Sequence, residues 1–182
     1  ELVKEDERNP MRATTYGVGE LLSRAVKRGC RNFIIGLGGS GTSDAGIGML
    51  RALVDIFAKG KTFDDAMKTE LGECRFTLAC DVDNPLCGEN GAAYVYAPQK
   101  GATPQMVEQL DRRAKLFAEK SALHYGYDRS CCPGAGAAGG LGYAFMQYLG
   151  AEMRSGADML LSLCRFDDVA KDADMIITGE GH

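Results

Sequence analysis

A chain of 182 residues is long enough to bury the core of one domain, or of one and a half. Apolar residues make up 45% and charged residues 25%, as in ordinary soluble proteins, and a net charge of −4 without a basic block argues against nucleic acid as a partner. No apolar run reaches membrane-spanning length and no signal-peptide pattern opens the chain, so we expect a cytoplasmic protein without a membrane partner, whose seven cysteines are reduced thiols.

The first half of the chain is predicted to alternate helices with strands. A helical apolar stripe follows Thr14 and Thr15, and short apolar runs flanked by glycine or aspartate indicate buried strands. We expect helices over residues 14–29, 47–57 and 63–67, and strands over 33–37 and 76–80.

The second half continues the alternation. Thr103 and Pro104 form a helix start, and the apolar stripe from Val107 to Ala118 is the clearest amphipathic pattern in the chain. A glycine-rich loop, residues 133–142, leads into another helix through Phe145 and Leu149. We further expect strands over 92–97, 159–163 and 175–178, and a short helix over 166–173. The class is therefore α/β, with residues 1–182 forming one domain.

The first loop after a predicted strand, Gly38–Gly46, suits an anion. Its glycines let backbone N–H groups turn toward a ligand, the next helix presents its positive end, and Ser40 and Thr42 add hydroxyl groups. The alternative is a tight turn in which Asp44 or Ser43 only caps the helix. The two interpretations are equally supported by the loop itself.

The later loops supply acids, a lysine and more glycine. Asp81 and Asp83 are two residues apart, so in an extended chain they face the same side and can share Mg²⁺ or polarise a hydroxyl group. The alternative is a solvated acidic turn. Lys100 can serve as a point charge for phosphate, Glu180 can bind metal, and residues 133–142 can form a second backbone cradle or a close helix contact. Ligands of open α/β sheets lie beyond the carboxyl ends of strands, so these loops are expected to converge on one cleft.

Other chemistries are less well supported. Gly36, Gly38 and Gly41 form a G-x-G-x-x-G string, which keeps a dinucleotide-dependent oxidoreductase as an alternative, although the acidic residue and second strand that such a site needs do not follow at the right distance. The Gly-Lys-Ser/Thr ending of a P-loop is absent from this loop, and no Ser-His-Asp pattern is visible.

Taken together, the motifs resemble the glycerate kinase family. The resemblance runs through nearly the whole chain and is most specific at Asp81–Leu86 and at Pro133–Gly140. It also covers the strings at residues 8–10, 15–21, 38–46, 81–88, 99–101, 133–142 and 178–181. The resemblance implies an enzyme of two α/β domains with its active site between them, and this chain matches mainly the inserted middle domain, with the edges of the Rossmann-like domain missing.

The resemblance implies transfer of the γ-phosphoryl group of ATP to D-glycerate, giving 2-phosphoglycerate, with ATP and Mg²⁺ as cofactors. Positioning and charge stabilisation then supply most of the catalysis. The alternative is a fragment that binds ligand without turnover, and a homo-oligomer is compatible with the sequence. The implied site residues are Asp44 and Asp81 as catalytic groups, Ser40, Thr42, Asn84 and Lys100 for substrate, Gly38, Gly39, Gly136 and Gly139 for the nucleotide, and Asp81, Asp83 and Glu180 for metal.

The sequence departs from the family pattern in the first loop. Where the family usually has Ala-Thr-Asn-Asp-Gly, this chain has Gly41-Thr42-Ser43-Asp44-Ala45. Ser43 has a shorter polar reach than asparagine, and Ala45 narrows the backbone freedom. His182 stands where arginine is common.

Overall fold

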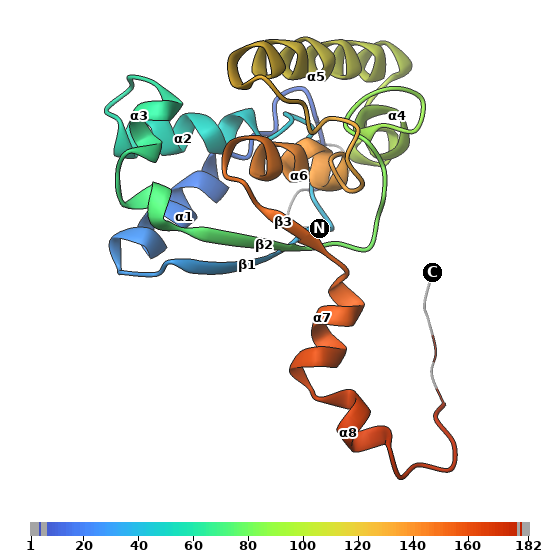
Figure 1. The fold of residues 1–182 in the computed structure, drawn as a ribbon. Coiled ribbons are helices and arrows are strands. Elements are labelled where there is room, and N and C mark those ends of the chain that lie inside the picture. The colour runs from blue at the N-terminus through green and yellow to red at the C-terminus, as the bar shows by residue number, and fades with distance from the viewer. Residues whose placement is uncertain (1–3, 5–6, 178, 180–182) are drawn as a thin grey trace.

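The computed structural model describes residues 4, 7–177 and 179. Its elements confirm an α/β fold in which helices lie over one face of a small sheet (Figure 1). The α-helices are α1 (Tyr16–Lys27), α2 (Ile47–Phe57), α3 (Phe63–Met67), α4 (Ala92–Tyr96), α5 (Pro104–Tyr125), α6 (Ala137–Tyr148), α7 (Gly156–Leu163) and α8 (Phe166–Ala170). The strands are β1 (Asn32–Gly36), β2 (Arg75–Ala79) and β3 (Glu152–Arg154).

The three strands form one parallel sheet in the order β1-β2-β3. Phe33 pairs with Phe76 and Leu78 with Met153, so all three strands end at the same edge. The loops that follow β1 and β2, and the start of α7 after β3, therefore leave the sheet on one side. This is the edge where open α/β sheets bind ligands.

The helix boundaries follow from capping. Thr103 Oγ1 accepts a hydrogen bond from the N–H of Met106, Pro104 occupies the first turn of α5, and Gly126 ends the helix in the left-handed region at φ 76°. The N-terminal part of α6 is irregular, because Ala138, Gly139 and Gly140 all have positive φ. The regular turns of α6 therefore begin only after Gly140.

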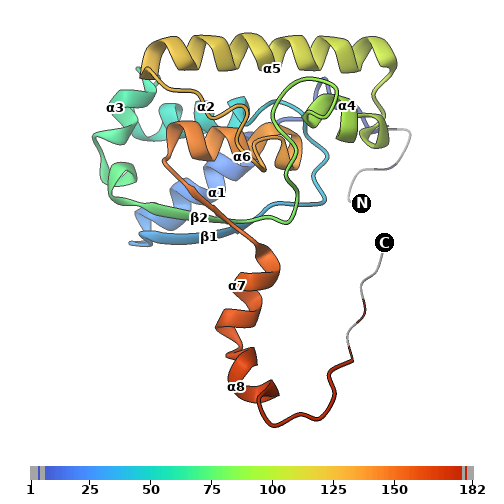
Figure 2. The ribbon, with the colours of Figure 1, turned by 45° about the vertical axis from the view of Figure 1, so that its right-hand side comes forward.

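One main apolar core lies between the helices and the sheet. Among its fully buried side chains are Met49 and Leu53 of α2, Leu78 of β2 and Phe145 of α6. A second, smaller cluster joins α4 to α5 through Ala93, Ala97, Val107 and Leu110. Helix α5 lies over α2, α4 and α6, on the side away from the sheet, in both views (Figures 1 and 2).

Four sequence-based expectations about the elements were wrong. Residues 92–97 form no strand, since residues 92–96 are helix α4, and residues 159–163 belong to α7. Residues 175–177 have no regular structure, and Thr178 lies outside the described residues. The strand at 33–37 exists as β1 but is not buried on both faces, since Ile34 is 62% exposed.

Helices α7 and α8 project away from the rest of the chain in both views (Figures 1 and 2). Their surface is unusually apolar, with Leu160, Leu163 and Val169 exposed. In the part of the chain that the structure describes, none of the helices combines the length and apolar character needed to cross a bilayer.

Candidate functional site

Lys100 ties the loop after β1 to the short 3-10 turn Pro98–Lys100 (η3) that precedes α5. Its Nζ donates hydrogen bonds to Ser40 Oγ at 2.9 Å and to the carbonyl oxygen of Thr42 at 2.6 Å. Three of the four residues expected to bind substrate therefore meet at the carboxyl end of β1, Thr42 through its backbone carbonyl oxygen. Since residues 92–96 form α4 and residues 98–100 form η3, the lysine reaches this edge from a helical turn and not from a strand end.

Lys100 is only 7% exposed, which is unusual for an ammonium group. Burial lowers its pKa to about 8, and the negative charge of Asp44 opposes this shift. Because the site holds a positive charge that is poorly solvated, a bound anion would be stabilised there by more than it would be at the surface.

Asp44 holds the N-terminal segment against the first loop. Its Oδ2 accepts hydrogen bonds from the N–H of Thr15 at 2.8 Å, from Thr15 Oγ1 at 2.9 Å and from the N–H of Gly48 at 3.1 Å. Its Oδ1 accepts one from the N–H of Gly46 at 3.1 Å. Asp44 thus caps α2, as the alternative interpretation of this loop expected, and its catalytic role stays a prediction.

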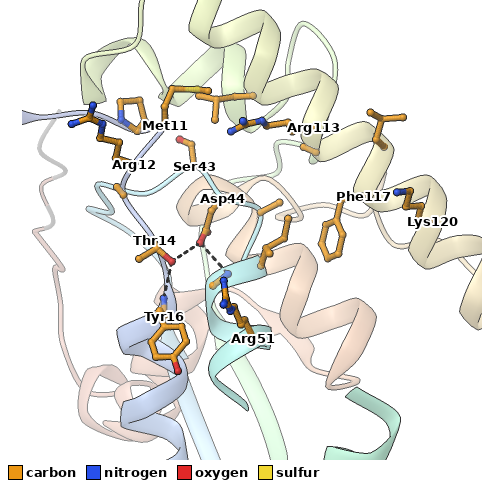
Figure 3. A pocket seen from close by; sticks show the side chains of 18 residues that line it. Met11, Arg12, Thr14, Tyr16, Ser43, Asp44, Arg51, Arg113, Phe117 and Lys120 are labelled. Carbon is orange, nitrogen blue, oxygen red and sulfur yellow. Dashed lines mark hydrogen bonds between the residues drawn. The ribbon is translucent and has the colours of Figure 1, made fainter. Parts of the chain in front are cut away.

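A cavity of about 710 Å³ lies beside this loop and contains Asp44 in its wall (Figure 3). It lies between residues 10–16, the start of α2 and one side of α5. Its charged lining consists of Arg12, Asp44, Arg51, Arg113 and Lys120. Apart from Asp44 these charged residues were not among the sequence-based candidates, because isolated basic residues on helix surfaces are usually only solvated.

Asp81 and Asp83 line a different, smaller cavity of about 310 Å³, together with Arg154 and Ser155. Asp81 Oδ1 accepts hydrogen bonds from Ser155 Oγ at 3.0 Å and from the N–H of Gly156 at 2.9 Å. Asp81 and Asp44 therefore line separate cavities and do not face one common cavity. Asp81 and Asp83 line the same cavity, and a Mg²⁺ ion shared between them stays a prediction.

The side-chain amide of Asn84 is hydrogen bonded within the protein at both its nitrogen and its oxygen. Its Nδ2 donates to the carbonyl oxygen of Asn90 at 2.9 Å, and its Oδ1 accepts a hydrogen bond from the hydroxyl of Tyr96. Substrate binding by Asn84 stays a prediction.

The glycines expected to bind nucleotide fall into two groups. At Gly38 and Gly39 a Cβ atom would meet no other atom within 4 Å, so their backbone faces open space. At Gly136 a Cβ atom would lie 2.3 Å from the carbonyl oxygen of Pro85, and at Gly139 only 2.0 Å from that of Thr42. Close packing therefore accounts for the second pair, and a phosphate contact by their backbone stays a prediction.

The expected metal ligands are only partly placed. Glu180 lies outside the described residues. Within the described part of the chain, no three Asp, Glu, His or Cys side chains gather into a metal-binding group. Two carboxylates in one cavity nevertheless suit Mg²⁺, which commonly takes one or two carboxylates together with waters and substrate phosphates.

Comparison with known proteins decides the family. The model of the glycerate kinase family matches residues 1–182. The chain belongs to the glycerate kinase family. It is 41% identical over 196 residues to a glycerate kinase of Haemophilus influenzae, covering 99% of this chain and 52% of that protein. It is 40% identical over 205 residues to glycerate 2-kinase of Escherichia coli, covering 100% of this chain and 52% of that protein.

A solved structure agrees with these relatives. A protein from Salmonella typhimurium LT2, provisionally assigned as glycerate kinase 2, matches with a TM-score of 0.82 and 36% identity. The match covers 100% of this chain and 53% of that one. The chain thus spans about half the length of these members of the glycerate kinase family.

The dinucleotide string gains no support from this fold. Gly36 ends β1, but α2 begins only at Ile47 and β2 only at Arg75. A dinucleotide fingerprint requires its glycines to lead directly into a helix, followed by a strand and an acidic residue about 20 residues on.

Proposed function

We propose that the protein containing this chain transfers the γ-phosphoryl group of ATP to D-glycerate and yields 2-phosphoglycerate. The observation that carries the proposal is the family match over residues 1–182. The names of its relatives, glycerate kinase and glycerate 2-kinase, support the substrate and the position of phosphorylation.

The substrate-binding part of the proposal uses the cluster around Lys100. A buried ammonium group beside the hydroxyl of Ser40 forms a compact site for a carboxylate or phosphate oxygen, and charge-assisted hydrogen bonds of this kind are stronger than neutral ones. Lys100 at present donates to Ser40 and Thr42, so an arriving anion would share a donor that already has partners. Ser40 can turn its hydroxyl hydrogen toward the ligand.

Asp81 and Asp83 are the side chains that would hold Mg²⁺, which when bound neutralises phosphate charge as it develops. Asp44 acts on the substrate site by fixing the loop that carries Ser40 and Thr42. In this proposal the described residues bind and orient the reactants, which is most of what phosphoryl transfer asks of a protein.

The test is ADP release by the full-length protein supplied with Mg-ATP and D-glycerate. We expect ADP release that depends on glycerate, and a product whose phosphorus resonance couples to the proton at carbon 2. ADP formation that does not respond to glycerate would refute the kinase. A product phosphorylated at carbon 3 would refute the position alone.

A further inference from the structure

The start of α7 holds the carboxylate of Asp81 through one of its two oxygens. Oδ1 accepts hydrogen bonds from Ser155 Oγ at 3.0 Å, from the N–H of Gly156 at 2.9 Å and from the N–H of Ala157 at 3.4 Å. Oδ2 receives no hydrogen bond from any described residue. The carboxylate is therefore fixed at Oδ1, while the lone pairs of Oδ2 remain available to a ligand.

Gly156 contributes to this arrangement by having no side chain. A Cβ atom at this position would lie 2.8 Å from Asp81 Oδ2, which is closer than non-bonded atoms normally approach. The φ angle of Gly156 is not positive, so the backbone conformation does not itself require glycine. What the glycine provides here is room for Oδ2 of Asp81.

Ser155 makes two contacts with one hydroxyl group. Its Oγ accepts a hydrogen bond from the N–H of Asp158 at 3.2 Å, which caps α7, and it donates its single hydrogen to Asp81. An aspartate would cap the helix equally well but has no hydrogen to donate. The hydroxyl of Ser155 therefore does more than capping requires.

These contacts lie beside the cavity that Asp81 shares with Asp83. Ser155 lines that cavity together with the two aspartates, and β3 leads into α7 at this edge of the sheet (Figures 1 and 2). Hydrogen bonds to a ligating carboxylate orient it and change its affinity for a cation. The first residues of α7 are thus placed to control how Asp81 meets a cation.

We propose that Ser155 and Gly156 are positioning residues for Asp81. Ser155 holds Oδ1, and the missing side chain of Gly156 leaves Oδ2 free to bind a divalent cation. The identity of this cation as Mg²⁺ rests on the proposed function. Cation affinity is then set by two residues that do not themselves bind the cation.

The first test is Gly156→Ala in the full-length protein, with Mn²⁺ as a paramagnetic probe of divalent-cation binding and no nucleotide present. The new methyl group should displace Oδ2, so we expect the Mn²⁺ affinity measured by electron paramagnetic resonance to fall about tenfold. The melting temperature should stay within about 2 °C of the wild type, because alanine is the better helix former. A lowered melting temperature with unchanged affinity would show a merely structural glycine and overturn its role.

Gly17→Ala is the matched control. Gly17 also lies in the first turn of a helix, α1, without positive φ, and a Cβ atom there would meet nothing within 4 Å. This variant should bind Mn²⁺ like the wild type. An equal loss of affinity in both alanine variants would overturn the contact with Oδ2 as the cause.

Ser155 is tested by a removal and a conservative replacement. Ser155→Ala should weaken Mn²⁺ binding about tenfold and also lower the melting temperature, and Ser155→Thr should restore both. Wild-type affinity in Ser155→Ala and Gly156→Ala, beside a loss in Asp81→Asn, would overturn the positioning role alone. Wild-type affinity in Asp81→Asn would overturn the metal assignment of the proposed function as well. The expected affinities in a protein without glycerate-dependent ADP release would support the positioning role and contradict only the kinase assignment.

Discussion

The backbone N–H of Ala45 donates a hydrogen bond to the carbonyl oxygen of Gly139 at 3.0 Å. This contact joins the loop after β1 to the glycine-rich entry of α6. The approach is closest at Thr42, whose carbonyl oxygen would lie 2.0 Å from a Cβ atom at Gly139. The two glycine-rich loops therefore support each other, and the position of Thr42 beside Lys100 depends on the absence of a side chain at residue 139.

Gly139→Ala should destabilise the protein strongly. The new methyl group would collide with backbone, and φ of 69° is unfavourable for any residue with a Cβ atom, so we expect a loss of about 3 kcal/mol or more in the free energy of unfolding. Gly126→Ala is the matched control, because Gly126 also has positive φ but open space around it, and should lose only about 1 kcal/mol. Urea denaturation of both variants measures the difference, and similar losses would contradict the packing role.

Asp44→Asn should lower stability by about 2 kcal/mol, because an amide cannot accept all the hydrogen bonds that Thr15, Gly46 and Gly48 donate to the carboxylate. Asp55→Asn, which alters exposed contacts with Arg51 and with the hydroxyl of Tyr16, should change stability by less than about 1 kcal/mol. Chemical denaturation at neutral pH provides both values. A fully stable Asp44→Asn protein without activity would instead support the catalytic role predicted for this residue.

Activity should fall as pH rises through about 8. Lys100 binds an anion only when protonated, and burial has brought its pKa down to about 8, so kcat/KM for D-glycerate should drop about tenfold per pH unit well above that value. Lys100→Arg, which stays charged, should remove this decline in whatever activity it retains. A wild-type profile that stays flat to pH 10 would contradict the assignment.

The lowered pKa of Lys100 also predicts that the stability of the fold rises with pH, whereas activity falls. The folded pKa of Lys100 lies below its ordinary value of 10.5, so between pH 8 and 10.5 the unfolded chain binds a proton that the folded chain has released. Stability relative to Lys100→Met should therefore rise with pH across this window and be level below it. Denaturation midpoints of the two proteins at several pH values measure the difference, and a relative stability that falls with pH would reverse the conclusion.

Asp81→Asn and Asp83→Asn should separate metal binding from helix capping. Asp81 accepts from Ser155 and Gly156, so its substitution should lower stability by about 1 kcal/mol and also reduce the rate by orders of magnitude at ordinary Mg²⁺ concentration. Asp83 makes no such contact among the described residues, so Asp83→Asn should raise the Mg²⁺ requirement and leave stability unchanged. Rates measured across a Mg²⁺ titration would decide, and two variants with the wild-type requirement would contradict the metal role.

The sequence predicted the α/β class and most helices because their signals are local. Thr103 with Pro104 marks the start of α5, and its apolar stripe is long enough to be unambiguous. The parallel sheet could be expected from the alternation, although β3 was missed, since three residues are too few to form a pattern.

Two incorrectly predicted strands, residues 92–97 and 159–163, show that tertiary packing can override the strand propensity of a short segment. Residues 92–97 contain tyrosine and valine, which favour strands. They nevertheless pack on α5 through Ala93 and Ala97, and residues 92–96 form α4. For α7 a usable signal was present: Ser155 followed by Asp158 is a helix-start pattern, and Ser155 Oγ does accept from the N–H of Asp158.

The candidate site was predictable only in part, because a sequence shows residue types but not which residues are in contact. Ser40 and Thr42 were predicted as hydroxyl donors to an anion and Lys100 as a point charge for phosphate, but nothing in the sequence indicates that the three residues are in contact. The basic lining of the larger cavity was not predicted, because Arg12 and Arg113 become neighbours of one cavity only when α5 lies across the N-terminal segment. Ala45, a departure from the family pattern, does adopt a positive φ of 52°, the strained conformation that a glycine there would relieve.

One carboxylate oxygen of Asp81 connects the loop after β2 to the start of α7. Oδ1 accepts from Ser155 and Gly156, which begin the helix that leads the chain away from the sheet. Any ligand that takes over this oxygen must compete with the helix for it, so occupancy of the cavity and the order of α7 are thermodynamically linked. By reciprocity, a contact that holds α7 in place would change the affinity of any ligand that uses this oxygen of Asp81.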